Sequence, residues 1–258
     1  MSALLAQRSR AAAAPRASEV GPPVLVACAH GTREPRARRA MGLLVAALAA
    51  ARPGLAVRAA FVDVQPPGVP DAVAAVLLRR QRAVVVPLLL SGGHHVHVDI
   101  TQAVAGSSAD ASAALGPDER LTAILVDRLH QAGANADDAI VLAAAGSSDS
   151  RANCDVETVR RQLSLRWGAA VEIGYGAKAA PAVPEAVARL RRERPGRRVV
   201  VASYLLAPGH FHHRLRASGA DLVSAPLCLA QGSVDPRLVE VVLERYDAVG
   251  AERARSRP

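Results

Sequence analysis

Cysteine is scarce in this chain of 258 residues. The three cysteines, Cys28, Cys154 and Cys228, lie far apart and form no CxxC pair. This spacing gives no basis for a disulfide framework or a cysteine-bound zinc, and it is typical of a reducing compartment. We therefore expect a cytoplasmic protein, with Cys28 as a small buried hydrophobic residue inside a strand.

Aromatic side chains make up only 2% of the sequence, which argues against the stacking platforms that bind single-stranded nucleic acid. No uncharged apolar run approaches 18 residues, so no transmembrane span is expected. The apolar stretch AAAAP at 11–15 is too short for a secretory signal, although the composition of 1–20 leaves a transit peptide open. We expect neither a nucleic acid nor a membrane as partner.

Lysine occurs once, at Lys178, and every other basic residue except histidine is arginine. The formal net charge is +9, of which the ends 1–20 and 251–258 carry +4, leaving +5 for the body. A modestly basic body suits an acidic ligand. The two ends carry no readable function, and 1–20 is expected to be a disordered tail.

Short apolar runs that alternate with helical patterns are abundant in the chain. The runs at 24–29, 55–62 and 83–90 are continuous, which is typical of parallel strands buried on both faces. Helical spacing of apolar residues predicts helices between and after them, at 34–51, 69–80 and 118–132. Strand–helix–strand order indicates βαβ units with right-handed crossovers.

The second half repeats this order. Its expected strands are 139–145, 170–175, 197–206 and 221–227, and its expected helices are 150–166, 182–193 and 235–248. GVPDAV at 68–73 matches AVPEAV at 182–187, and DERL at 118–121 matches DPRL at 235–238. The sequence therefore predicts an α/β protein with two similar parallel-sheet domains that arose by internal duplication.

The predicted domains are 21–135, which carries the candidate active site, and 136–250, with a tail at 251–258. The joint falls near GANADD at 133–138. The segment 105–114 has a loop-like composition and interrupts the place where a fourth strand of the first domain should lie.

Chemically active side chains follow the first three strands. His30 follows the first, Asp63 the second, and the turn Gly92-Gly93-His94-His95 the third. Ligands of open parallel sheets bind beyond the carboxyl ends of the strands, so these groups are expected to converge. Imidazole and carboxylate suit first-row divalent metals, and imidazole can accept a proton near neutral pH.

The duplicated half lacks the imidazoles, because Ala145 and Phe211 stand where the first half has His30 and His95. His97 has no clear role, and Asp99 either orients His95 or favours a helix N-terminus. These observations predict one active site on a twofold scaffold.

Two other readings of the motifs fit less well. The run from His95 to Asp99 matches the HxHxD core of metallo-β-lactamase-like hydrolases, but Ile100 follows where a histidine is expected, and no antiparallel patterning is present. Dinucleotide binding is disfavoured because His30-Gly31-Thr32 offers one glycine rather than G-x-G-x-x-G.

Together these motifs resemble one known family. HGT at 30–32, the FVD run at 61–63, VVVPLLLSGGHHV at 84–96 and LAPGHF at 206–211 resemble the class II chelatases, specifically the long, two-domain sirohydrochlorin chelatases of the CbiX/SirB type. The resemblance covers about 23–248. It implies two flavodoxin-like, chelatase-like lobes with a divalent metal and the acidic tetrapyrrole sirohydrochlorin meeting in the cleft between them.

The resemblance implies that His30 and His95 are catalytic and hold the metal, with Asp63 as a third metal ligand where the family commonly has glutamate. Arg33, Gly92, Gly93 and His94 are expected to contact the substrate. Fe²⁺ for sirohaem and Co²⁺ for cobalamin synthesis both remain open as the metal substrate, and no tightly bound cofactor is expected. The alternative is a carrier that binds metal or tetrapyrrole without turnover. A monomer is expected, and a dimer remains open.

Overall fold

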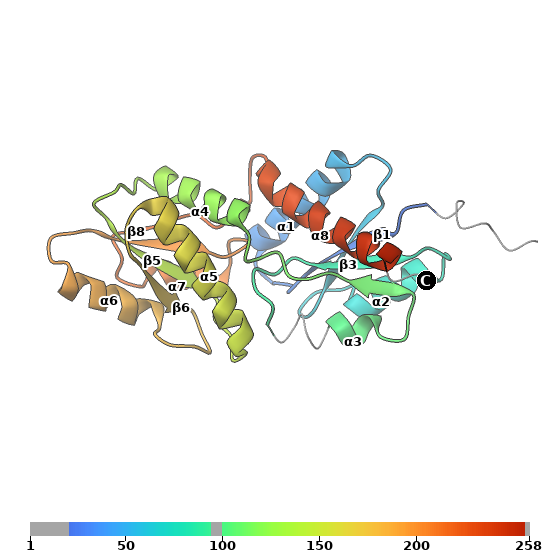
Figure 1. Cartoon of the computed structure of the whole chain (residues 1–258), viewed down its shortest axis with the longest axis horizontal. Coiled ribbons are helices and arrows are strands. Elements are labelled where there is room, and N and C mark those ends of the chain that lie inside the picture. The colour runs from blue at the N-terminus through green and yellow to red at the C-terminus, as the bar shows by residue number, and fades with distance from the viewer. Residues whose placement is uncertain (1–20, 94–99, 256–258) are drawn as a thin grey trace, which may run out of the picture.

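Two parallel β-sheets, one from each half of the chain, form the centre of the protein in a computed structural model that describes residues 21–93 and 100–255 (Figure 1). The first sheet has the order β2-β1-β3-β4 and the second the order β6-β5-β7-β8. All neighbouring strands are parallel. The strands of the first sheet are β1 (Val24–Ala29), β2 (Val57–Phe61), β3 (Ala83–Pro87) and β4 (Ala109–Ala111). Those of the second are β5 (Ala139–Ala144), β6 (Val171–Tyr175), β7 (Val199–Tyr204) and β8 (Leu222–Val223). The expected α/β fold with a duplicated parallel sheet is confirmed.

Helices cover the faces of both sheets. They are α1 (Pro35–Ala51), α2 (Val69–Leu77), α3 (Thr101–Val104), α4 (Glu119–Gln131), α5 (Ser150–Trp167), α6 (Val183–Glu193), α7 (His210–Arg216) and α8 (Pro236–Arg255). Aspartates cap α4 and α5, since Asp118 and Asp149 accept hydrogen bonds from the amides of Arg120 and Arg151. None of the helices in the described part of the chain combines the length and hydropathy that a bilayer-spanning segment requires.

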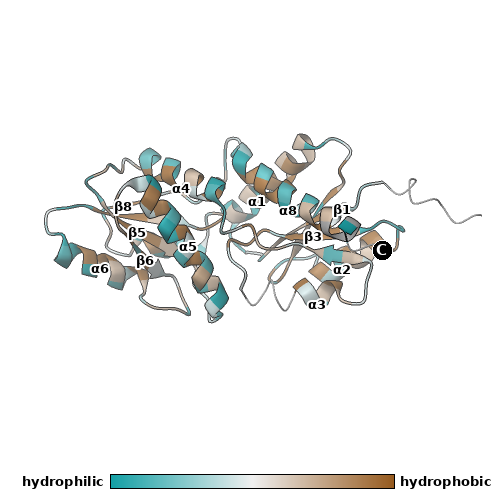
Figure 2. Ribbon diagram, in the orientation of Figure 1, coloured by the Kyte–Doolittle hydropathy of each residue, from teal (hydrophilic) through white to brown (hydrophobic). Residues whose placement is uncertain are grey.

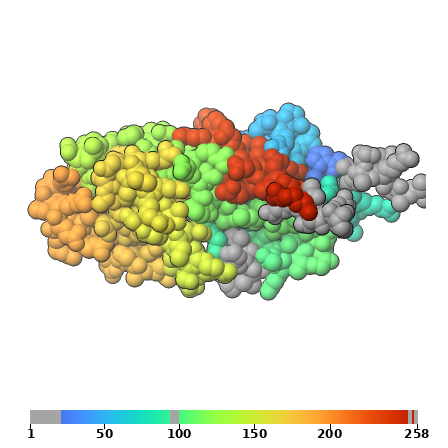
Figure 3. Space-filling view, in the orientation of Figure 1, coloured from blue at the N-terminus to red at the C-terminus, as the bar shows by residue number. Residues whose placement is uncertain are grey.

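The last helix of each repeat packs on the sheet of the other repeat. Helix α4 contacts α5 and β7, whereas α8 contacts α1 and β3 (Figure 1). In the space-filling view, α5 and α6 (yellow and orange) lie on the left and α8 (red) covers the first lobe on the right (Figure 3). The two lobes are therefore tied together, although the repeat boundary in the sequence falls between α4 and β5.

One hydrophobic core runs through both lobes. Strands β1, β5 and β7 are buried along their whole length, as continuous apolar runs predict. Leu25 and Leu44 of the first lobe belong to the same buried cluster as Leu142 of the second. Figure 2 shows apolar strands in the interior and polar residues on the outer faces of the helices.

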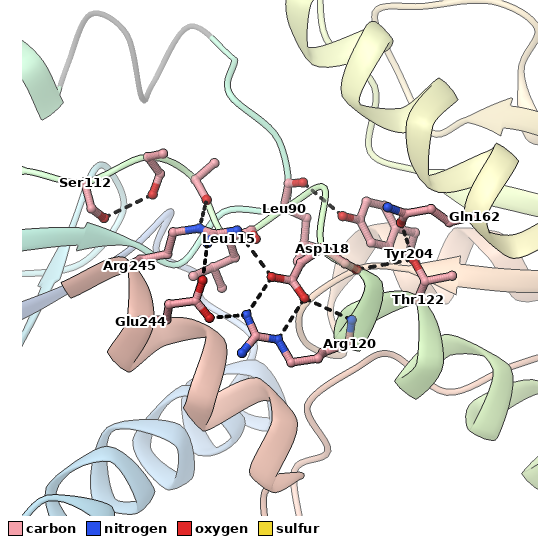
Figure 4. Close-up of polar contacts among 12 residues, drawn as sticks. Leu90, Ser112, Leu115, Asp118, Arg120, Thr122, Gln162, Tyr204, Glu244 and Arg245 are labelled. Carbon is pink, nitrogen blue, oxygen red and sulfur yellow. Dashed lines mark hydrogen bonds and ion pairs between the residues drawn. The ribbon is translucent and has the colours of Figure 1, made fainter. Parts of the chain in front are cut away.

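Hydrogen bonds stabilise the junction between the two lobes (Figure 4). Arg245 of α8 donates to the carbonyl oxygens of Ala114 and Leu115, both at 3.0 Å. The Tyr204 hydroxyl at the end of β7 donates to the carbonyl oxygen of Leu90 at 3.0 Å. Burial raises the pKa of Tyr204, so the phenol stays a donor. The ends of β3 and β7 are thus held together across the lobes.

The structure differs from the sequence prediction mainly in short elements. The segment 105–114 does contain a fourth strand, because Ala109–Ala111 pairs with Ala83–Val85, so the loop prediction for it was wrong there. Strand β8 has two residues, shorter than the expected 221–227. Helices α3 and α7 were not predicted, since they are too short to show helical periodicity. Helix α8 runs past the expected end at 248 to Arg255, so 251–255 of the expected tail are helical. The expected tail at 1–20 and residues 256–258 lie outside the described residues.

Candidate active site between the lobes

A cleft of about 490 Å³ lies between the lobes, beyond the carboxyl ends of the central strands. Its first wall is formed by the residues that follow β1 and β3, and its second wall by those that follow β5, β6 and β7. The lining is mostly apolar with a few polar groups, as in many small-molecule sites. The position agrees with the ligand site expected for open parallel sheets.

His30 lines the cleft directly after β1, and it is exposed. The next residue, Gly31, has a left-handed backbone with φ of +96°. A Cβ atom at this position would lie 1.8 Å from the carbonyl oxygen of Asp63. Only glycine therefore lets the chain turn here against the neighbouring loop, and this turn sets His30 at the cleft.

The loop after Gly31 is fixed by its own hydrogen bonds. The amide of Thr32 donates to Oε1 of Gln65 at 2.8 Å, and the amide of Glu34 donates to Oγ1 of Thr32 at 3.0 Å. Nε of Arg38 donates to the carbonyl oxygen of Thr32 at 2.8 Å. The segment between β1 and α1 is thus bonded to the loop after β2, and these bonds hold the backbone next to His30 in place.

Asp63 lies beside His30 through the main chain, because its amide donates to the carbonyl oxygen of His30 at 2.9 Å. Its carboxylate is exposed and accepts from the amide of Val64 at 2.7 Å, and Asp63 is not among the residues that line the cleft. Arg33 is exposed and is likewise not among them. The roles predicted for these two side chains remain predictions.

The glycine turn after β3 reaches the second lobe. The amide of Gly92 donates to a carboxylate oxygen of Asp155 on α5 at 2.8 Å. Gly93 lines the cleft, and a Cβ atom there would lie 3.3 Å from Oγ of Ser147. The chain just before His94 is therefore anchored on the opposite lobe.

The other predicted residues, His94, His95, His97 and Asp99, lie outside the described residues. Within 21–93 and 100–255, no three His, Cys, Asp or Glu side chains come close enough to hold a metal ion. The predicted set of His30, His95 and Asp63 includes one residue beyond these ranges, so it remains a prediction.

The second wall repeats the backbone of the first without its imidazole. Ala145 occupies the position of His30, and its carbonyl oxygen accepts from the amide of Ala177 at 3.0 Å. Gly146 has φ of +84°, and a Cβ atom there would lie 2.0 Å from the carbonyl oxygen of Ala177. Phe211 lines this wall and is 37% exposed. The duplication is structural, whereas the chemistry of the two walls differs.

Sequence reasoning missed three basic residues of the second wall, Lys178, His210 and His212. His212 is buried, and its Nε2 lies 3.1 Å from the carbonyl oxygen of Ser224. Burial lowers the pKa of His212, which keeps its ring neutral and structural at neutral pH. The HFHH run at 210–213 could have pointed to the two histidines. Lys178 could have been found by aligning the two repeats, because it stands where the first repeat has Val64.

No Asp or Glu is present among the described residues that line the cleft. The ionisable groups of this described lining are the imidazoles of His30, His210 and His212, the phenol of Tyr204 and the ammonium group of Lys178. Asn153 adds a buried Oδ1 that has no hydrogen-bond partner, while its Nδ2 donates to the carbonyl oxygen of Ser147 at 3.3 Å. A lining that, among the described residues, has a lysine and no carboxylate favours an anionic ligand.

Comparison with solved structures finds the same fold. SirB from Bacillus subtilis with Fe³⁺ matches with a TM-score of 0.74 and 18% identity over 91% of this chain and 98% of that one. The same enzyme from Bacillus subtilis subspecies spizizenii, in complex with cobalt, gives a TM-score of 0.71 and 17% identity over 91% and 98%. CbiX, described as the terminal enzyme for sirohaem biosynthesis in denitrifying bacteria, gives 0.61 and 18% over 87% and 98%.

The comparison with curated proteins gives no significant match. The family model of CbiX matches this chain twice, over residues 24–132 and 139–249. These two matches coincide with the two structural repeats and cover most of the chain. The chain therefore belongs to the CbiX family and carries two copies of its unit.

Proposed function

We propose that this protein is a sirohydrochlorin chelatase, which inserts a divalent metal into sirohydrochlorin and releases two protons. The observation that carries the proposal is the cleft between two duplicated lobes, with His30 on one wall and Ala145 at the equivalent place on the other. Metal and base are needed on one face of a flat macrocycle only. A single imidazole-bearing wall meets that need.

The reaction requires a base close to the metal. Each M²⁺ that enters the ring displaces two pyrrole N–H protons, so the net change is one metal bound and two protons lost. We assign to His30, which lines the cleft, the acceptance of one of these protons, because imidazole is a suitable general base. We assign the same role to His95, and metal delivery to both, with Asp63 assisting.

The cleft suits the substrate as a whole. Apolar residues such as Leu88, Ala144 and Leu206 can cover the faces of the macrocycle. The substrate is a polycarboxylate, and the described residues of the lining include no carboxylate that would repel it. Both walls come from one chain, so we infer that a monomer is sufficient, and we place it in the cytoplasm with its reduced cysteines.

We propose Fe²⁺ or Co²⁺ as the metal, because imidazole binds both and the SirB structures hold iron and cobalt. A loosely held metal is required, since it must leave for the macrocycle. A site of two histidines with a weak carboxylate meets that need better than a closed four-ligand site.

The experiment is a spectral assay of sirohydrochlorin mixed with Co²⁺ or Fe²⁺ under anaerobic conditions, with and without protein. The proposal predicts that protein accelerates the loss of the metal-free absorbance over metal alone, with repeated turnover. A carrier would instead bind one equivalent of metal or tetrapyrrole and then stop. That stoichiometric result would overturn the enzyme assignment.

A further inference from the structure

Lys178 is the single lysine of the chain and the one Lys or Arg among the described residues that line the cleft. The described arginines all lie outside the lining of the cleft. Within the described ranges, Lys178 is exposed and has no hydrogen bond or ion pair. A cation that lines a cleft without an internal partner can bind an anionic group of a ligand.

Lys178 differs from its counterpart in the first repeat in its side chain and not in its backbone conformation. Lys178 has φ of +59°, and Val64, at the equivalent position of the first lobe, has φ of +67°. The bridges between Phe61 and Gly68 and between Tyr175 and Ala182 close the two loops in the same way. The left-handed backbone therefore belongs to the fold, and the second lobe uses the position to present an ammonium group.

An apolar surface lies next to this loop. A Cβ atom at Gly176 would lie 2.8 Å from Cδ1 of Phe211, so the ring packs directly on the backbone two residues before Lys178. The ring of His210 meets Phe211 edge-on, with centroids 6.0 Å apart. The second wall thus joins a partly exposed aromatic ring to a positive charge.

A flat, apolar ligand with acidic substituents at its edge matches both features. The aromatic ring would contact the face of such a ligand, while the ammonium group would meet a carboxylate at its rim. The first lobe has Val64 at the equivalent position, and Val64 is not among the residues that line the cleft, so this contact would be made by one lobe only.

On this basis, and resting on the proposed function, we propose that Lys178 is a substrate-binding residue that holds a peripheral carboxylate of the macrocycle against Phe211. The second lobe is then the anchoring wall, and the first lobe carries the metal chemistry. The anchor orients the macrocycle and contributes to selection of polycarboxylate rings over neutral ones.

The test measures binding of metal-free sirohydrochlorin by fluorescence titration, together with KM and kcat for metal insertion. Lys178→Gln is compared with Lys178→Arg, which keeps the charge, and with Arg192→Gln, an exposed arginine of α6 outside the cleft. We expect Lys178→Gln to raise Kd and KM about tenfold with little change in kcat, as for loss of a charge-assisted hydrogen bond. Lys178→Arg should recover most of the affinity.

A second ligand separates charge from shape. The methyl-ester form of the macrocycle should bind wild type and Lys178→Gln equally, because it has no carboxylate to pair. If wild type binds sirohydrochlorin and Lys178→Gln binds it equally well, the anchor assignment is wrong and the proposed function stands. If wild type does not bind sirohydrochlorin at all, the proposed function fails and the anchor fails with it.

Discussion

The main-chain amide of Asp63 donates a hydrogen bond to the carbonyl oxygen of His30 at 2.9 Å. This bond extends the pairing of β1 with β2 past the ends of both strands. In the second lobe, Ala177 and Ala145 make the same bond at 3.0 Å. The scaffold that positions a residue at the cleft is therefore present twice, and only the first copy carries His30.

Glycine at the turn after β1 is required by the close approach of the next loop. Gly31→Ala and Gly146→Ala would each place a Cβ atom against a carbonyl oxygen, whereas Gly54, with φ of +89°, has open space around it. Gly54→Ala should cost about 1 kcal/mol for its left-handed backbone, or about 2–4 °C in Tm. Both cleft variants should lose clearly more than this in thermal unfolding.

Activity distinguishes the two cleft glycines. Gly31→Ala should also reduce metal insertion per folded molecule, because it displaces His30, while Gly146→Ala should reduce it less. Equal losses of activity in the two variants would contradict the assignment of the chemistry to the first lobe.

We expect Asp155 to position the glycine turn after β3. Its carboxylate accepts from the amide of Gly92, two residues before His94. Asp155→Ala should lower kcat for metal insertion about tenfold, since small displacements of a catalytic group are costly. The control is Cys154→Ser, the exposed neighbour on the same helix.

Thermal unfolding of Asp155→Ala should change by only a few degrees, as for loss of a single hydrogen bond. An unchanged kcat with a lowered Tm would show that the contact is structural only.

Asp118 makes the lobe junction sensitive to acid. Burial alone would raise the pKa of Asp118, but hydrogen bonds from Arg120 and the charges of Arg120 and Arg245 bring that pKa below its ordinary value. The stabilisation is therefore complete above the unfolded pKa of about 4 and is lost as pH falls through the lower folded value.

Asp118→Asn keeps a side chain that can cap α4 but removes the charge. Its Tm should lie below that of wild type at pH 7, and the gap should close as the pH falls below about 4. A gap that stays constant down to pH 2 would contradict this account. Differential scanning calorimetry across the pH series measures it.

The order of elements could be predicted because continuous apolar runs such as Val24–Ala29 give a clear strand signal, and the repeat fixes the register of the second half. The exchange of α4 and α8 between lobes could not be predicted. An amphipathic helix specifies that one face is buried, but not which of two similar sheets will cover it. Strand β4 was missed because three residues in a Ser- and Ala-rich segment show no alternation.

Within the site, the sequence predicted that His30 and Gly93 lie beyond the ends of strands, and both residues line the cleft, while their roles remain predictions. The position of Lys178 at the cleft could not be predicted, because a single lysine in an arginine-rich chain carries no signal of where it lies in the fold. The same offset of 114 residues that pairs Gly68 with Ala182 would have paired Lys178 with Val64. Whether a basic residue faces the cleft depends on its neighbours in the fold, which the local sequence does not specify.

The central claim is that His30 performs the chemistry of metal insertion. The most direct measurement is the rate at which His30→Ala converts sirohydrochlorin in the presence of Co²⁺ or Fe²⁺, with His130→Ala on α4 as the matched histidine control. We predict that His30→Ala lowers kcat at least about a hundredfold, as for loss of a general base, while it still binds the macrocycle and His130→Ala keeps the full rate. A His30→Ala protein that folds, binds sirohydrochlorin and inserts metal at the wild-type rate would contradict the account.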